Sequence, residues 1–241
     1  IDELVPGRAA GVWVYTFHAF AARLLRRHAE SLRLPRDFTI YDSDDQKRLI
    51  VSSLKELGME EEKNKARLYV GVISRAKDDL LDPESYAIYA MAQQDRFRQN
   101  VAKVYRLYQS KLEASGGVDF GDLLMKLARL LKEDERVREL YQRRFEHVLV
   151  DEYQDTNYAQ YLITKTLAAR HRNLCVVGDP DQSIYRFRGA TIRNILEFES
   201  DFKDVATIKL EQNYRSTPNI LNAAAAVIGN NRRRAPKSLW T

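Results

Sequence analysis

The chain has 241 residues, of which 44% are hydrophobic and 30% are charged, so it is long enough to bury one large core or two smaller ones. No apolar run approaches the ~18 residues of a membrane span and no charged-then-apolar leader opens the chain, which predicts a cytoplasmic protein without an export signal. The single cysteine, Cys175, excludes an internal disulfide framework and a cysteine-rich zinc module. Its apolar neighbours predict a position in the core.

The formal net charge of +5 is concentrated at the C-terminal end of the chain. Residues 212–241 carry five basic side chains and no acidic one, so residues 1–211 are formally neutral. A basic tail suits an anionic partner such as nucleic acid, but such a run is more often just a solvated chain end. Charge alone therefore leaves both interpretations open.

The first third of the chain predicts one strand followed by helices. The apolar run from Val12 to Phe17 is typical of a short strand, and an amphipathic helix with Leu24 and Leu25 on its apolar face follows it. From about Pro35 to Gly117 the sequence shows only helical periodicity, with a capping box expected over residues 43–46. This stretch predicts an all-helical insertion.

Beyond the insertion, helices alternate with short apolar strands, which is the pattern of a parallel α/β sheet. Asp119 is expected to cap a leucine-rich helix, and Thr217 with Pro218 should open the last helix. The expected strands are His147–Val150, Leu174–Val177 and Val205–Leu210.

Two adjacent carboxylates, Asp151 and Glu152, follow the first of these strands. At the carboxyl end of a sheet strand, one carboxylate could hold Mg²⁺ while the other accepts a proton from a water that attacks a phosphate. The alternative is that they are ordinary acidic residues at an exposed loop edge.

The next strand also ends in a polar loop, Gly178 to Ser183, which contains Gln182. A glutamine beside the metal edge could hydrogen-bond both the terminal phosphate and the attacking water. The alternative is a Gly-Asp-Pro turn with a capping side chain.

Aromatic and basic residues alternate from Tyr185 to Arg188. In an extended segment, Tyr185 and Phe187 would point one way and the two arginines the other, an arrangement that suits stacked bases and phosphates of single-stranded nucleic acid. The same pattern is compatible with two aromatic side chains that anchor the next helix to the core.

The last expected strand is followed by Tyr214 and Arg215. Arg215 could stabilise charge on a terminal phosphate and Tyr214 could stack on a base, although either could be an ordinary surface residue. The phosphate-binding pattern G-x-x-x-x-G-K-[ST] is absent from the sequence. Either the acidic pair has another role, or the phosphate-binding loop precedes Ile1.

Three motifs in this order resemble those of superfamily 1 DNA helicases of the UvrD, PcrA and Rep type. They are DEYQDTN at 151–157, VVGDPDQSIYRFRGA at 176–190 and LEQNYRS at 210–216, supported by TFHAFAARLLR at 16–26 and DFGDLL at 119–124. In that last motif Gly121 replaces a common aspartate, and Phe187 stands where tryptophan is frequent.

The resemblance implies an α/β fold with a RecA-like parallel sheet of the P-loop NTPase type and an all-helical insertion subdomain. Residues 1–34 and 118–210 would form the first motor domain, 35–117 the insertion, and 211–241 the start of the second motor domain.

The resemblance also implies ATP and Mg²⁺ as cofactors and single-stranded DNA and its junctions with duplex as partners. For catalysis, Asp151 would bind Mg²⁺, Glu152 would activate water, Gln182 and Arg215 would contact the γ-phosphate, and Tyr214 would stack on adenine. The implied DNA-contacting residues are Phe17, His18, Tyr185, Phe187 and Arg188.

The implied activity is ATP-dependent 3′-to-5′ translocation and duplex unwinding in DNA repair or replication, in the bacterial cytoplasm and nucleoid. Because the phosphate-binding loop should precede Ile1 and the rest of the second domain should follow Thr241, the 241 residues alone are expected to be monomeric and inactive. Repair or replication proteins are conceivable further partners. The alternatives are a noncatalytic DNA-binding or protein-docking module and the motor portion of a helicase-nuclease.

Overall fold

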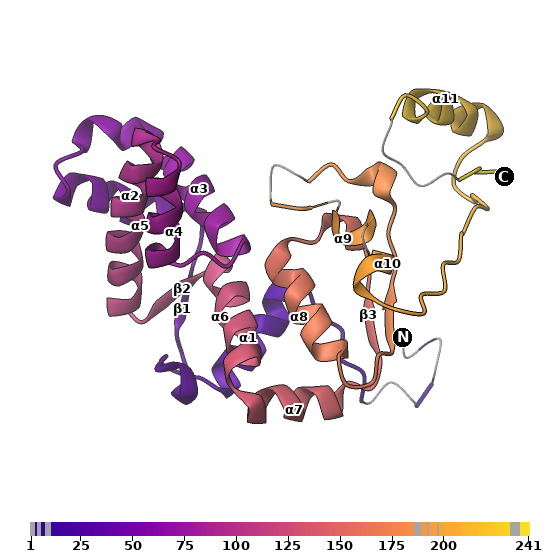
Figure 1. The fold of residues 1–241 in the computed structure, drawn as a ribbon, viewed down its shortest axis with the longest axis horizontal. Coiled ribbons are helices and arrows are strands. Elements are labelled where there is room, and N and C mark those ends of the chain that lie inside the picture. The colour runs from indigo at the N-terminus through magenta and orange to yellow at the C-terminus, as the bar shows by residue number, and fades with distance from the viewer. Residues whose placement is uncertain are drawn as a thin grey trace. The chain divides into compact units, whose positions relative to one another are not determined.

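The computed structural model describes residues 3, 6–7, 11–185, 189–191, 193–196, 198–231 and 237–241. The chain divides into two compact units, Ile1–Tyr141 and Gln142–Thr241 (Figure 1). Across the described residues, no helix combines the length and the apolar character that a membrane span needs.

Helix α1, Phe17–Arg27, begins where the Thr16 hydroxyl accepts a hydrogen bond from the backbone nitrogen of Ala19 over 3.2 Å. The strand predicted for residues 12–17 is wrong: residues 12–16 form no strand, and Phe17 already belongs to the helix. Val12 and Val14 are 55% and 67% exposed, because within this unit no described strand pairs with their segment.

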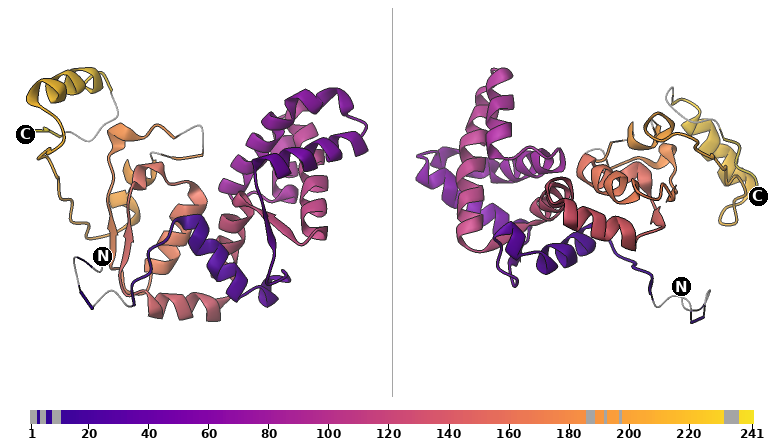
Figure 2. Two further views of the ribbon diagram at one scale, coloured as in Figure 1. Left: turned by 180° about the vertical axis from the view of Figure 1, so that it is seen from behind. Right: turned by 60° about the horizontal axis from the view of Figure 1, so that its bottom comes forward.

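Four helices gather into one bundle in the first unit, as the views of Figures 1 and 2 show. They bury a shared apolar core that includes Ile50, Tyr69 and Tyr105. The capping box of the first of these helices uses Asp42 and Asp45, one residue earlier than predicted. The helices are α2 (Ser43–Glu56), α3 (Ala66–Asp78), α4 (Pro83–Ala92) and α5 (Arg96–Ala114).

A two-stranded parallel sheet lies beside this bundle. The stretch from Pro35 to Gly117 is therefore not purely helical, and the prediction of an all-helical insertion is wrong in this respect. Strand β1, Thr39–Tyr41, pairs with β2, Gly117–Asp119, so that Ile40 lies opposite Val118. Gly117 is required here because a Cβ atom would lie 2.7 Å from the ring of Tyr41. Two three-residue strands carry too little apolar alternation to be recognised in the sequence.

Helix α6, Phe120–Glu133, starts at the predicted Asp119 cap, which forms a capping box with Asp122. Its leucine-rich side is buried and packs against α1. Helix α7, Glu135–Arg144, follows, and short 3-10 turns lie at Glu30–Leu32 and Glu60–Lys65.

The second unit contains the other parallel pair, β3 (Val148–Val150) and β4 (Leu174–Val176), with Leu149 opposite Cys175. These confirm two predicted strands, each one residue shorter than predicted. Cys175 is exposed, which corrects its predicted core position, because it shares the uncovered side of this pair with Leu149, itself 75% exposed. The helices are α8 (Tyr158–Ala168), α9 (Arg193–Leu196), α10 (Phe198–Asp201) and α11 (Pro218–Ile228).

The strand predicted for Val205–Leu210 is absent. The segment forms no strand pairing, and Ile208 and Leu210 are each 80% exposed. Helix α11 does begin at Pro218 and end at Gly229 as expected, although the Thr217 side chain makes no capping bond. Small parallel sheets among many helices agree with the α/β class.

Candidate nucleotide site

Asp151 and Glu152 lie where β3 ends, directly after the buried Val150. Both acidic residues are exposed, and the backbone nitrogen of Glu152 donates to Asp151 Oδ1 over 2.9 Å. Glu152 has φ +50°, a left-handed conformation that is costly for a residue with a side chain and is concentrated at functional sites. The turn therefore aims a carboxylate at the end of the strand at some cost to the backbone.

Gln154 joins this turn to the loop that follows β4. Its side chain is almost completely buried, its Nε2 donates to Glu152 Oε2 over 2.7 Å, and its Oε1 accepts from the backbone nitrogen of Asp179 over 3.0 Å. Each atom of the amide thus serves a different loop. Buried amide groups of this kind fix the geometry of what they bond, because any displacement leaves a polar group without a partner.

Gly178 is the residue at which the loop after β4 comes close to the turn after β3. A Cβ atom at Gly178 would lie 2.5 Å from Gln154 Oε1 and 3.1 Å from the backbone nitrogen of Tyr153. That nitrogen continues the strand pairing by donating to the Val177 carbonyl over 2.9 Å. Any residue larger than glycine would push the two loops apart.

The loop after β4 forms a 3-10 turn, Pro180–Gln182, that Asp179 caps by accepting from the backbone nitrogen of Asp181 over 3.0 Å. Gln182 Nε2 donates to Asp179 Oδ2 over 2.8 Å, and Lys237 Nζ contacts the same carboxylate. Partial burial opposes ionisation of Asp179, but the hydrogen bonds from Lys237 and Gln182 hold its pKa below the usual range. Asp179 is therefore an anion at neutral pH and orients Gln182.

Tyr214 and Arg215 lie in a separate turn that Asn213 builds. Asn213 Oδ1 accepts from the backbone nitrogens of Arg215 and Ser216 over 2.9 and 2.7 Å, and the Tyr214 hydroxyl donates to Gln212 Oε1 over 2.7 Å. Tyr214 is 85% exposed. Within the described ranges, no hydrogen bond or ion pair joins either side chain to the loops of Glu152 and Gln182. The structure thus brings together Glu152 and Gln182 through Gln154 and Asp179, and it does not bring Tyr214 or Arg215 to them.

The residues implied in DNA contact are distributed over both compact units. Phe17 and His18 form the first turn of α1, and the His18 ring lies edge-on to Phe120 with ring centres 5.6 Å apart. Burial lowers the pKa of His18. Tyr185 is 37% exposed, whereas Phe187 and Arg188 lie outside the described residues.

No preformed metal cage is evident: the described residues include no group of three or more His, Cys, Asp or Glu side chains placed to share an ion. Mg²⁺ at nucleotide sites does not need one, because it is held by one or two carboxylates together with water and phosphate oxygens. The exposed carboxylate of Asp151 at the strand end fits that mode of binding.

Sequence reasoning missed three residues of this site: Gln154, Asp179 and Lys237. Gln154 stands inside the quoted DEYQDTN motif, so its motif position was a signal, but its link to Asp179 spans 25 positions. The glycine in front of Asp179 was the other available signal, since an apolar strand that ends in glycine often marks a close approach.

The parallel pair of β3 and β4, with a carboxylate pair after one strand and a polar loop after the other, defines an α/β domain with a candidate nucleotide site. The profile of the UvrD/REP helicase N-terminal domain matches residues 1–203, and the chain belongs to that family.

Curated relatives agree with this assignment. The chain is 48% identical over 233 residues to the ATP-dependent DNA helicase PcrA of Leuconostoc citreum, which covers 97% of this chain and 31% of the relative. It is 47% identical to PcrA of Staphylococcus aureus and 46% identical to PcrA of Staphylococcus epidermidis, each over all 241 residues and 33% of the relative. The chain thus spans about a third of the length of these relatives.

Proposed function

We propose that the chain is the ATPase-bearing part of a 3′-to-5′ DNA helicase that couples ATP hydrolysis to movement along single-stranded DNA and to duplex unwinding in repair or replication. The observation that carries the proposal is the double hydrogen bond of Gln154, which ties the carboxylate of Glu152 to the loop that orients Gln182. The similarity to the PcrA relatives, which are ATP-dependent DNA helicases, supports it.

In this proposal Asp151 holds Mg²⁺ and Glu152 accepts a proton from the attacking water. Mg²⁺ neutralises charge on the β- and γ-phosphates when it is bound. Gln182 contacts the terminal phosphate, and its attachment to Asp179 keeps the amide oriented for that contact. Gln154 holds the two loops in register, so a change in one loop is transmitted to the other.

In this proposal, residues 211–241 are the start of a second motor domain. Tyr214 and Arg215 contact the nucleotide from that domain. The exposed ring of Tyr214 is free to stack on adenine, and the planar guanidinium of Arg215 suits the terminal phosphate. Neither side chain forms a hydrogen bond with the described part of the Glu152 and Gln182 loops, so this proposal includes movement of the segment toward those loops when ATP binds.

Single-stranded DNA is the proposed track, contacted by Phe17, His18, Tyr185, Phe187 and Arg188. Stacking on aromatic faces and contact with phosphates carry little base specificity, so we propose none. We also propose that residues 1–34 and 118–210 belong to the first motor domain and that residues 35–117 form its helical insertion. Because the sequence contains no G-x-x-x-x-G-K-[ST] loop, we propose that the 241 residues alone do not hydrolyse ATP.

The test is Glu152→Gln in the intact polypeptide that contains this chain. The variant should bind ATP as the wild type does, while its DNA-stimulated turnover falls by roughly 10²–10⁴-fold, as expected for loss of a positioned general base. Turnover equal to the wild type would remove Glu152 from the chemistry. Tight DNA binding without ATPase in the wild type would favour a noncatalytic DNA-binding module instead.

A further inference from the structure

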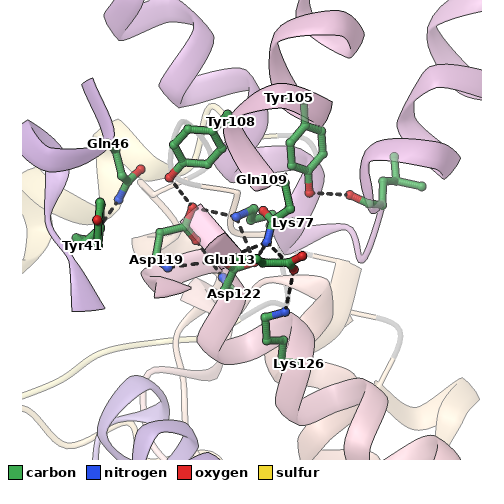
Figure 3. Close-up of polar contacts among 11 residues, drawn as sticks. Tyr41, Gln46, Lys77, Tyr105, Tyr108, Gln109, Glu113, Asp119, Asp122 and Lys126 are labelled. Carbon is green, nitrogen blue, oxygen red and sulfur yellow. Dashed lines mark hydrogen bonds and ion pairs between the residues drawn. The ribbon is translucent and has the colours of Figure 1, made fainter. Parts of the chain in front are cut away.

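A buried charge cluster lies between the helical bundle and the start of α6, and its two aspartates belong to the DFGDLL motif at 119–124 (Figure 3). The side chain of Lys77, from α3, is fully buried, and its Nζ contacts Asp119 Oδ2 at 2.6 Å and Asp122 Oδ1 at 2.9 Å. Both aspartates are buried as well. One ammonium group thus bridges two carboxylates away from water.

Helix α5 supplies further hydrogen bonds to these carboxylates. The Tyr108 hydroxyl donates to Asp119 Oδ2 over 2.7 Å, and Gln109 Nε2 donates to Asp122 Oδ1 over 3.3 Å. Figure 3 shows both side chains pointing into the cluster from α5. Burial opposes the charge of Lys77, but attraction to Asp119 and Asp122 raises its pKa, so the ammonium is charged at neutral pH.

The same two aspartates start helix α6. Asp119 Oδ1 accepts from the backbone nitrogen of Asp122 over 2.8 Å, and Asp122 Oδ2 accepts from the backbone nitrogen of Asp119 over 3.2 Å. A capping box needs only these two bonds. Here the capping carboxylates also hold a lysine from a helix 42 positions earlier, so the first turn of α6 is tied to α3 as well as capped.

Gly121 makes room for the lysine. A Cβ atom at Gly121 would lie 2.9 Å from both Cβ and Cδ of Lys77, so the aliphatic stem of the lysine lies directly on the first turn of α6. Substitution here would displace that stem without removing a charge.

The first turn of α6 carries Phe120, which lies between the two capping aspartates in the sequence. Its ring is 46% exposed and meets the half-buried ring of His18 edge-on. The first turn of α6 therefore carries the ring that the His18 ring contacts. A chain of direct contacts runs from Lys77 through Asp119 and Phe120 to His18.

We propose that Lys77 is a positioning residue: by holding Asp119 and Asp122 it fixes the first turn of α6, and through Phe120 it sets the His18 ring for contact with single-stranded DNA. This inference rests on the proposed function. A buried ion cluster often adds little net stability over apolar side chains of similar size, and in some proteins its charges instead select one arrangement of the groups that carry them. Geometric selection, more than stability, is the contribution of Lys77.

The test uses the intact polypeptide with the cluster neutralised by Lys77→Met, Asp119→Asn and Asp122→Asn together. Asparagine still accepts the capping hydrogen bonds, so α6 should form. Binding of a fluorescent oligothymidylate should weaken by roughly ten-fold or more, because a displaced contact residue loses its alignment. In the ATPase assay, the oligothymidylate concentration at half-maximal rate should rise equally, with kcat and the KM for ATP unchanged.

The matched control is Arg129→Met with Asp82→Asn. This pair, 2.6 Å apart, joins α6 to the residue that caps α4 and lies beyond the first turn of α6. It should leave oligothymidylate affinity within about two-fold of the wild type, as loss of a partly exposed ion pair does. Equal affinity in the neutralised and control variants would overturn the inference, and so would an equal loss of kcat and ATP affinity, which would indicate general loosening.

If the neutralised variant does not fold, Gly121→Ala decides the question with the same measurements, since it retains all charges and displaces only the stem of Lys77. Unchanged oligothymidylate affinity in that variant would then overturn the inference. A wild-type protein that binds oligothymidylate but lacks ATPase would contradict the proposed function alone. A wild-type protein that does not bind oligothymidylate would contradict both.

Discussion

Gln154 donates from Nε2 to Glu152 Oε2 over 2.7 Å, although only one residue separates the two in the sequence. The left-handed backbone of Glu152 makes this contact feasible by turning its side chain back over the following 3-10 turn, Tyr153–Asp155. Because the other end of the Gln154 amide is bonded to Asp179, the position of the Glu152 carboxylate is coupled to the loop of Gln182.

This coupling predicts the effect of Gln154→Leu. Leucine is of similar size but cannot bond either loop, so it leaves the partly buried nitrogen of Asp179 without its partner at a cost of about 1–3 kcal/mol in the free energy of unfolding. ATP turnover of the intact polypeptide should fall by roughly 10–100-fold, as when a group that orients a reacting residue is lost. Denaturant unfolding and steady-state ATPase assays measure the two effects.

Gln142→Leu is the matched control, since Gln142 Nε2 also donates a side-chain hydrogen bond within the second unit, to the Thr166 carbonyl over 2.6 Å. It should lower the stability by a similar amount and leave turnover unchanged. Equal loss of turnover in the two variants would reduce Gln154 to an ordinary structural residue.

Two glycine substitutions distinguish two reasons for the presence of glycine. At one position a neighbouring group comes too close for a side chain, and at the other glycine only adds backbone entropy to the unfolded chain. Gly178→Ala should destabilise the chain by about 1–3 kcal/mol, because the new Cβ meets Gln154 Oε1 and a backbone nitrogen in a packed junction. Gly71→Ala should stabilise it by about 0.5–1 kcal/mol, because Gly71 lies within helix α3 with nothing within 4 Å of the added atom. Urea unfolding of the two variants measures both signs, and destabilisation by Gly71→Ala would show that the helix tolerates no change there.

The sequence predicts best those elements whose signals are local. Helix α6 has its cap and its leucine pattern within one stretch, and β3 is an apolar run that ends at two acidic residues. The segments at 12–17 and 205–210 carry the same apolar composition, yet neither forms a strand, because a strand exists only where a neighbour pairs with it. Composition identifies a segment suited to a sheet and does not supply the partner.

The residues of the candidate site likewise fall into those with a local signal in the sequence and those without one. The positions of Asp151, Glu152 and Gln182 after apolar strands could be predicted because acidic and amide side chains stand out there, whereas their roles stay predictions. Gln154 and Lys77 could not, because each is a buried polar residue whose partner lies 25 or 42 positions away. No local pattern in the sequence shows what either residue bonds.

Lys77→Met alone should be far more damaging to stability than the neutralised triple variant. Removing only the cation leaves Asp119 and Asp122 as two buried carboxylates side by side, which costs about 3–5 kcal/mol for a broken buried pair. Replacing Asp119 and Asp122 by asparagine in addition should recover most of this loss. Urea denaturation of the 241-residue chain measures the difference, and purely additive effects of the three substitutions would show that the charges do not interact.

Two half-buried histidines of the first unit predict how stability depends on pH. Burial lowers the pKa of His18, and burial together with the charge of Arg27 lowers that of His28, both from an ordinary value of 6.5. The unfolded chain therefore takes up protons at a higher pH than the folded chain. Their contribution to stability is fully present above pH 6.5 and is lost as the pH falls through the lowered folded-state values.

Replacing both histidines, as His18→Gln with His28→Gln, should flatten this dependence. The measurement is the free energy of unfolding of the 241-residue chain between about pH 5 and pH 7.5, where ordinary histidines titrate and carboxylates change little. The wild type should lose stability toward the acidic end, and the double variant should lose less. Each single variant should remove part of the slope, since each histidine has its own environment: the His18 ring contacts Phe120, whereas His28 Nε2 hydrogen-bonds the Tyr141 hydroxyl over 3.0 Å. An identical slope in the wild type and the double variant would show that neither imidazole changes its proton affinity on folding.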